Sequence, residues 1–340
     1  MDNYATPPPA VTAEQPSPDP NRPKFVSVLE PIEPAIEHVK LMLFRPFDLG
    51  KWFIIGFCAW LAYLGEGGGG GNPGGGGPRG GFNQISNQQE FSRQISEFKS
   101  EIWPYLPLII IGGIFLIVFV FIISLVLAWL RSRGRFMFVH CIAENKAEVV
   151  VPWNKYSRHG NSLFLFKVVV SIISLLVILL PVAAMIFSII AVCGGMYVPA
   201  GVIGIIAAVL ILFVICILMI LIHKFTDDFV VPIMFINTAS VVEGWKKFLA
   251  IAGRNKARLL LYILFQIVIS IVISIIGTLI CCIGFCLCCS CILLCIPYIG
   301  TVVLLPLLAF KRSYSLFYLR QFGPQYDVFI PQVNIPTAQG

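Results

Sequence analysis

Cysteine is concentrated in one stretch near the C-terminal end of the chain, in a pattern that could bind a metal. Seven of the eleven cysteines fall between Cys281 and Cys295, and two pairs have C-x-x-C spacing: Cys286 with Cys289, and Cys288 with Cys291. In soluble proteins, thiolates at this spacing hold zinc or an iron–sulfur cluster. The flanking residues here are Ile, Leu and Phe, among which free cysteine packs as a small apolar side chain. Three interpretations stay open: apolar packing, disulfides, and a metal or redox site. We predict no cofactor.

A second group of residues, His223, Asp227 and Asp228, could form a cation site or a proton relay. They stand at i, i+4 and i+5, so a continuous helix would bring His223 next to Asp227. The alternative is a solvated turn in which Lys224 pairs with the carboxylates. No set of nucleophile, base and orienting residue stands out in the sequence, which favours a protein that is not an enzyme.

The elements that position these residues are long apolar segments. The chain has 12% charged and 58% hydrophobic residues, against about 25% and 45–50% in soluble domains. Uncharged runs of 29, 55 and 52 residues cover Ile102–Leu130, Val168–Ile222 and Leu259–Phe310. About 20 residues cross a bilayer as a helix, so the first run predicts one span and the others two each. The 14 residues of Trp52–Gly65 predict a short span, because Lys51 can reach the headgroups.

The sequence therefore predicts an all-α fold, a polytopic transmembrane helix bundle of about six spans with interfacial amphipathic helices. A disordered Pro-rich arm (1–33) and an interfacial amphipathic helix (34–50) precede the membrane domain (51–322), and a tail (323–340) follows it. A Gly-rich outer loop occupies residues 65–81. The spans are placed near residues 51–65, 105–130, 166–192, 202–222, 259–281 and 291–311.

The distribution of lysine and arginine predicts the orientation of these spans. Six basic residues follow the second span and six follow the fourth, whereas the connections near Cys193–Gly201 and Cys281–Pro297 have none. Basic segments stay on the cytoplasmic side of membrane proteins. We therefore predict that both termini are cytoplasmic, in a multi-pass protein of the cell membrane.

One basic segment is the candidate for contact with anionic lipid. It precedes the fifth predicted span and contains Lys246, Lys247, Arg254, Lys256 and Arg258. Each basic residue gains about 1 kcal/mol near an anionic leaflet. The first functional hypothesis is thus a non-enzymatic scaffold, assembly or lipid-interacting protein. Its predicted partners are the bilayer, anionic headgroups, and other membrane proteins or further copies of the chain, but no nucleic acid.

The second hypothesis is a transporter or channel-like protein for a small or lipidic substrate. Pro181 and Pro306 lie within predicted spans and would kink them. Gln266, Ser270 and Ser274 stand at i, i+4 and i+8, so they form one polar stripe, which could line a path or hydrogen-bond neighbouring helices.

Several motifs resemble an uncharacterised family of polytopic prokaryotic membrane proteins, distantly similar to the membrane domain of some glycerophosphodiester phosphodiesterases. They are Leu43–Asp48 with Lys51-Trp52, Phe229–Pro232 with Glu243–Trp245, Pro297–Gly300 through Pro306, and Ser315–Arg320. The resemblance covers roughly Pro31 to Ile330. It implies a six-helix bundle in a prokaryotic inner or plasma membrane, with no established activity. The chain has no room for a separate phosphodiesterase domain.

Overall fold

The computed structural model describes residues 26–64, 105–194, 198–286 and 297–329. All regular elements in these ranges are helical, which confirms the predicted all-α class. The α-helices are α1 (Ile32–Phe44), α2 (Leu49–Ala62), α4 (Leu106–Glu144), α5 (Val150–Lys155), α6 (Ser157–Cys193), α7 (Val198–Phe225), α8 (Val231–Asn237), α9 (Val241–Arg254), α10 (Lys256–Cys286), α12 (Pro297–Val303) and α13 (Leu305–Arg320). A π-helical turn, η2 (Thr226–Val230), joins α7 to α8, and a 3-10 turn, η3 (Pro324–Tyr326), follows α13.

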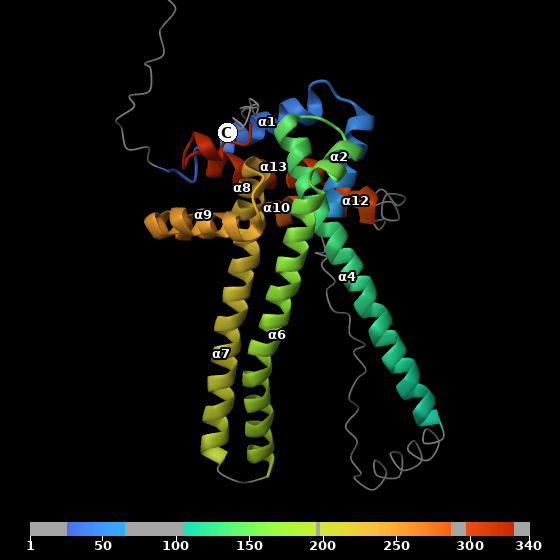
Figure 1. The fold of residues 1–340 in the computed structure, drawn as a ribbon, viewed down its shortest axis with the longest axis vertical. Helices are drawn as coiled ribbons and strands as arrows, with labels where there is room; N and C mark the ends of the chain where they lie inside the picture. The colour runs from blue at the N-terminus through green and yellow to red at the C-terminus, as the bar shows by residue number, and fades with distance from the viewer. Residues whose placement is uncertain (1–25, 65–104, 195–197, 287–296, 330–340) are drawn as a thin grey trace, which may run out of the picture.

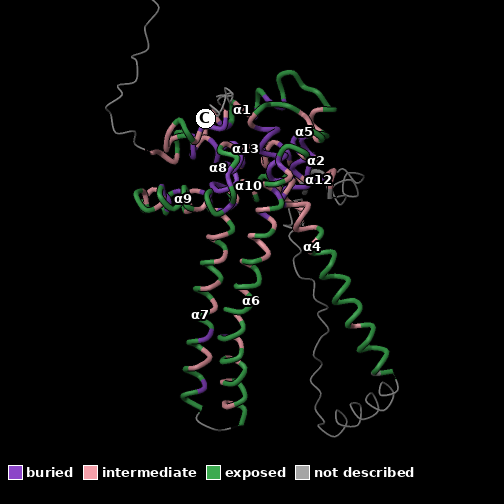
Figure 2. The backbone as a smooth tube through the Cα atoms, in the orientation of Figure 1, coloured by how far each residue is buried: buried purple, intermediate pink, exposed green. Residues whose placement is uncertain are grey.

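Three long helices, α4, α6 and α7, extend from an assembly of mostly shorter helices in which the long helix α10 also begins (Figure 1). We call residues 106–130 of α4, 168–193 of α6 and 198–222 of α7 the stem. The head consists of α1, α2, α5, α8, α9, α12 and α13 with the adjoining ends of the long helices. Buried residues gather in the head, while the stem is mostly exposed or half-buried although its side chains are apolar (Figure 2). An exposed surface of this kind suits a hydrocarbon solvent.

Four of the described helical segments are long and apolar enough to cross a membrane: Pro107–Glu144, Ser157–Cys193, Val198–Asn237 and Lys256–Ile280. The other two predicted spans have a different form. The first is the short helix α2, and the last, beyond the undescribed residues 287–296, is divided at Leu304 into α12 and α13. Pro306 lies in the first turn of α13, where a proline starts a helix without kinking it. Pro181, by contrast, lies inside the continuous helix α6.

Helix α2 packs against the part of α4 that follows the stem. Lys51 Nζ donates to Asn145 Oδ1 at 2.8 Å at one end of the contact, and Arg131 Nε donates to the Leu64 carbonyl oxygen at 2.6 Å at the other. Between them, the buried thiols of Cys58 and Cys141 lie 3.7 Å apart. The partner of α2 is thus the head end of α4, and a crossing by residues 51–65 stays a prediction.

Helix α1 also belongs to the head, and residues 26–31 before it, which the sequence assigned to the disordered arm, are held on α13. Tyr314 donates to the Val28 carbonyl oxygen at 2.9 Å, and Ser27 N donates to Gln321 Oε1 at 2.7 Å. The helix ends at Phe44 because the next residue, Arg45, precedes a proline and is extended. A new helix begins at Leu49, where Asp48 Oδ1 accepts from Gly50 N at 2.8 Å. Such a cap satisfies an otherwise unpaired N–H group.

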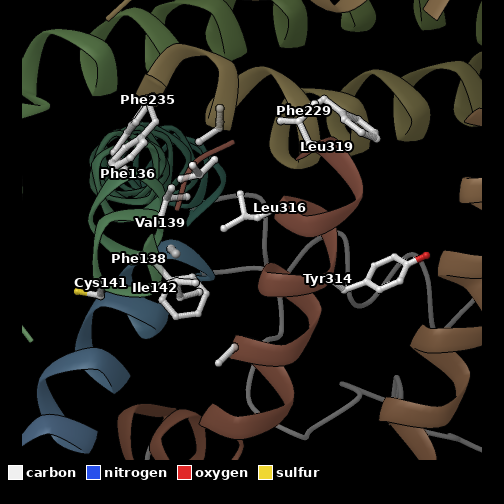
Figure 3. Close-up of a cluster of buried hydrophobic side chains, with 14 of the residues drawn as sticks. Phe136, Phe138, Val139, Cys141, Ile142, Phe229, Phe235, Tyr314, Leu316 and Leu319 are labelled. Atoms are coloured by element: carbon white, nitrogen blue, oxygen red, sulfur yellow. The ribbon is translucent and has the colours of Figure 1, made fainter. Parts of the chain in front are cut away.

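The centre of the head is a cluster of large apolar side chains from several helices (Figure 3). Helix α4 contributes the consecutive residues 136–139, α8 contributes Phe235, and α13 contributes Leu316 and Leu319. All are buried. The burial of four successive residues shows that this part of α4 is enclosed on all sides, which a stripe-like sequence pattern does not reveal.

His38 of α1 provides a pH-dependent contribution to the stability of the head. Its Nε2 lies 2.9 Å from the Ile142 carbonyl oxygen, and burial lowers its pKa below the usual 6.5. Because the unfolded chain binds this proton more readily, stability should fall as the pH drops below about 6.5 and reach its full value above it. Melting temperatures in detergent at pH 8 and pH 5.5 measure the effect. His38→Gln should show a smaller difference between these two pH values, and an unchanged difference would contradict the assignment.

Candidate functional site

Two carboxylates stand at the junction of the stem and the head, in the π-helical turn η2. Asp227 Oδ1 lies 3.0 Å from Lys167 Nζ of α6 and forms an ion pair with Arg135 of α4. Asp228 Oδ2 lies 2.8 Å from Lys224 Nζ and accepts a 3.0 Å hydrogen bond from Tyr262 of α10. The turn therefore joins α4, α6, α7 and α10 through charge-assisted bonds, which are stronger than neutral ones.

Arg312 of α13 completes this charged cluster. Only 7% of its surface is exposed, and Nη1 donates to the Asp227 carbonyl oxygen at 2.5 Å. Gln266, which is also buried, donates to the Tyr262 hydroxyl at 2.9 Å and accepts from Lys224 Nζ at 3.4 Å. Gln266 therefore belongs to the cluster, whereas Ser270 and Ser274 of the predicted polar stripe are exposed.

A cavity of about 110 Å³ opens beside the cluster. Its lining combines Ala62, Tyr63 and Phe138 with the charged residues Arg135, Lys224, Asp227, Asp228, Lys311 and Arg312. Four of these residues are basic and two are acidic, so the lining carries an excess of two formal positive charges. Charges removed from water are costly unless they are matched, and the excess makes the cavity suited to an anion.

The sequence identified Asp227 and Asp228 but not the residues around them. The predicted cation site joined them to His223, which is exposed, while the structure surrounds the two carboxylates with lysine, arginine and tyrosine. Within the described ranges, no group of three or more His, Cys, Asp or Glu residues is placed to hold a metal. Arg135 and Arg312 lie far from residue 227 in the sequence, so neither spacing nor periodicity could identify them as neighbours.

The predicted cysteine site falls almost entirely outside the described residues. Cys288, Cys289 and Cys291 belong to the undescribed segment 287–296, and Cys286 is the last residue of α10. Cys282 is described as a free, exposed thiol. The three interpretations of the cluster therefore stay predictions.

The five residues predicted to contact anionic lipid lie on α9 and at the start of α10. Lys246, Lys247, Arg254 and Lys256 are exposed. Arg258 is half-buried and donates to Asn255 Oδ1 at 3.2 Å. Ser240 and Glu243 cap the start of α9 reciprocally, through the Ser240 side chain and the backbone N–H groups, which fixes where the helix begins.

Helix α9 has two distinct surfaces. Val241, Gly244, Phe248 and Ile251 are buried against the head. Val242 and Leu249, seven residues apart and therefore on one face, are 62% and 57% exposed. In Figure 1, α9 runs across the direction of α6 and α7 at the end of the stem. A helix with exposed apolar residues beside lysines, lying across the helices of the stem, is typical of the membrane–water interface.

The chain matches the model of a protein family. The family is described as a family of unknown function (DUF7544), and its model matches residues 26–300. No curated protein and no solved structure matches the chain significantly. The match agrees with the predicted likeness to an uncharacterised family, and the distant likeness to phosphodiesterase membrane domains stays a prediction.

Proposed function

Because the chain belongs to this family of unknown function, we propose a role from its physical features: it is a multi-pass membrane protein whose head binds anionic lipid headgroups through α9. The apolar stem supports insertion into a bilayer, since its exposed side chains are largely aliphatic and aromatic. The role is that of a non-enzymatic scaffold or assembly partner. The proposal includes cytoplasmic termini, supported by the basic segments between the spans, and a location in the cell membrane.

The exposed surface of α9 is the observation that carries this proposal. Lys246 lies one turn after Val242, and Lys247 and Arg254 lie seven residues apart on the adjacent face. With Val242 and Leu249 inserted among the acyl chains, the three basic side chains would lie at the level of the headgroup phosphates. Each would gain about 1 kcal/mol from an anionic leaflet.

The test uses the full chain in nanodiscs of neutral or partly anionic lipid. Hydrogen–deuterium exchange of residues 241–254 should slow several-fold when phosphatidylglycerol replaces part of the phosphatidylcholine. In the triple variant Lys246→Gln, Lys247→Gln, Arg254→Gln, we expect this lipid-dependent protection to disappear, because the attractive charge has been removed.

A control neutralises two basic residues elsewhere in the head. Lys40 of α1 and Lys146 after α4 are also exposed, so the double variant Lys40→Gln, Lys146→Gln should keep the protection of α9. If α9 exchanges equally fast in both lipids in the unmodified protein, the proposal is wrong.

A further inference from the structure

We propose that the cavity between α2, α4, η2 and α13 binds one phosphoryl group, as carried by an anionic phospholipid or by free phosphate. This site is separate from the exposed surface of α9 and holds a single ligand inside the head. Four basic side chains face the cavity or its edge: Arg135, Lys224, Lys311 and Arg312.

Each carboxylate of the site is paired with basic protein groups, and these positive charges compensate its repulsion of an incoming anion. Asp228 is held by Lys224 and Tyr262, at 2.8 and 3.0 Å. Asp227 is held by Lys167 at 3.0 Å and by Arg135. Lys167 is not part of the lining, so its charge comes in addition to the four basic residues counted there. Net attraction for an oxyanion remains after these pairs are formed.

Arg312 is fixed in place to act as the main donor. Its Nη1 bond to the Asp227 carbonyl oxygen orients the guanidinium within a nearly closed environment. A guanidinium has five N–H donors in one plane, and this fork matches the oxygens of a phosphate. Because the side chain is buried, little rotamer entropy remains to be lost when the anion binds.

The size of the cavity agrees with this ligand. A cavity needs roughly 10–15 Å³ of probe-occupied volume to hold one water molecule. At about 110 Å³, the cavity has room for a phosphate group with its four oxygens, together with bridging water.

The position of the cavity agrees with a lipid as the source of the phosphate. Arg135 follows the stem part of α4 by five residues, and Lys224 follows the stem part of α7 by two. If the stem lies in hydrocarbon, these side chains reach the headgroup level, where a phosphodiester can enter without leaving the bilayer.

Two measurements on the full chain in detergent test the site and identify the source. Native mass spectrometry with added phosphatidylglycerol should show one tightly held lipid, and Lys311→Gln should weaken it about tenfold, since a charge-assisted hydrogen bond is lost. Lys311→Arg should restore binding. Sodium phosphate should raise the melting temperature more than sodium chloride of equal ionic strength, and less so in Lys311→Gln.

The controls separate this site from the surface of α9. The triple α9 variant should keep the single tightly held lipid. Should that variant lose it while Lys311→Gln keeps it, the cavity inference fails and the α9 proposal stands. Lys311→Met, which keeps the length of the side chain and leaves the Lys224–Asp228 pair intact, provides a second variant if Lys311→Gln does not fold. Response to phosphate without lipid binding assigns the site to the free anion, and absence of both responses overturns the inference.

Discussion

Replacing Asp228 with leucine should destabilise the purified protein by about 3–5 kcal/mol, because it leaves a partly buried lysine without its counter-charge. Asp228 is 8% exposed and pairs with Lys224 at 2.8 Å, and it also accepts a hydrogen bond from the buried hydroxyl of Tyr262. Unfolding by denaturant in mixed micelles, followed by near-UV circular dichroism, measures the change. The transition should move to a clearly lower denaturant concentration than in the unmodified protein.

A double-mutant cycle shows whether the loss comes from the ion pair. Lys224→Leu alone should also destabilise the protein, whereas Asp228→Leu with Lys224→Leu should recover part of the loss, since no unpaired charge remains. Glu37→Leu on the exposed side of α1 serves as a control and should change stability by no more than about 0.5 kcal/mol. Additive effects of the two cluster substitutions would show that the carboxylate and the ammonium do not act as a pair.

Replacing Gly134 with valine should separate α2 from α4. A β-carbon on Gly134 would lie 2.6 Å from the backbone carbon of Leu61 and 2.7 Å from the backbone nitrogen of Ala62. Backbone atoms cannot turn aside as a side chain can, so we expect a loss at the upper end of the 1–3 kcal/mol usual for overpacking, or more. The same denaturant titration measures it, and exchange of the α2 amides should rise.

Gly112 offers a matched control on the same helix. A β-carbon there meets no atom within 4 Å, so Gly112→Val should leave the unfolding transition nearly unchanged. Equal effects at positions 112 and 134 would mean that valine acts through helix propensity and not through the contact with α2.

The sequence predicted what depends on local composition. Uncharged runs identified α4, α6, α7 and α10, because a helix that is apolar on every side either crosses a membrane or lies in the core of a large protein. The start of α9 was not predicted, although serine followed three residues later by glutamate, as at Ser240 and Glu243, is a recognisable helix start. Gly194 and Pro199 lie at the turn between α6 and α7, as residues that end or restart helices do.

What the sequence did not predict depends on contacts between distant residues. The bond from Arg312 to Asp227 joins residues 85 positions apart, and that from Lys167 to Asp227 joins residues 60 positions apart. Charge counts placed these side chains near the ends of spans, but they contain no information on which ends meet. The pairing of α2 with the head end of α4 has the same cause: hydropathy measures how apolar a helix is and not which surface it covers.

The contact between α6 and α7 bears on how the chain is assembled. Gly204 lies so close to α6 that a β-carbon would meet the Ser188 hydroxyl at 2.5 Å, and one on Gly201 would meet Val192 at 2.4 Å. Helices in lipid associate through such close packing of small residues, and here all the partners come from one short stretch of chain. This hairpin can therefore form during synthesis, before α10 and α13 have left the ribosome, and can serve as the template on which the later helices dock.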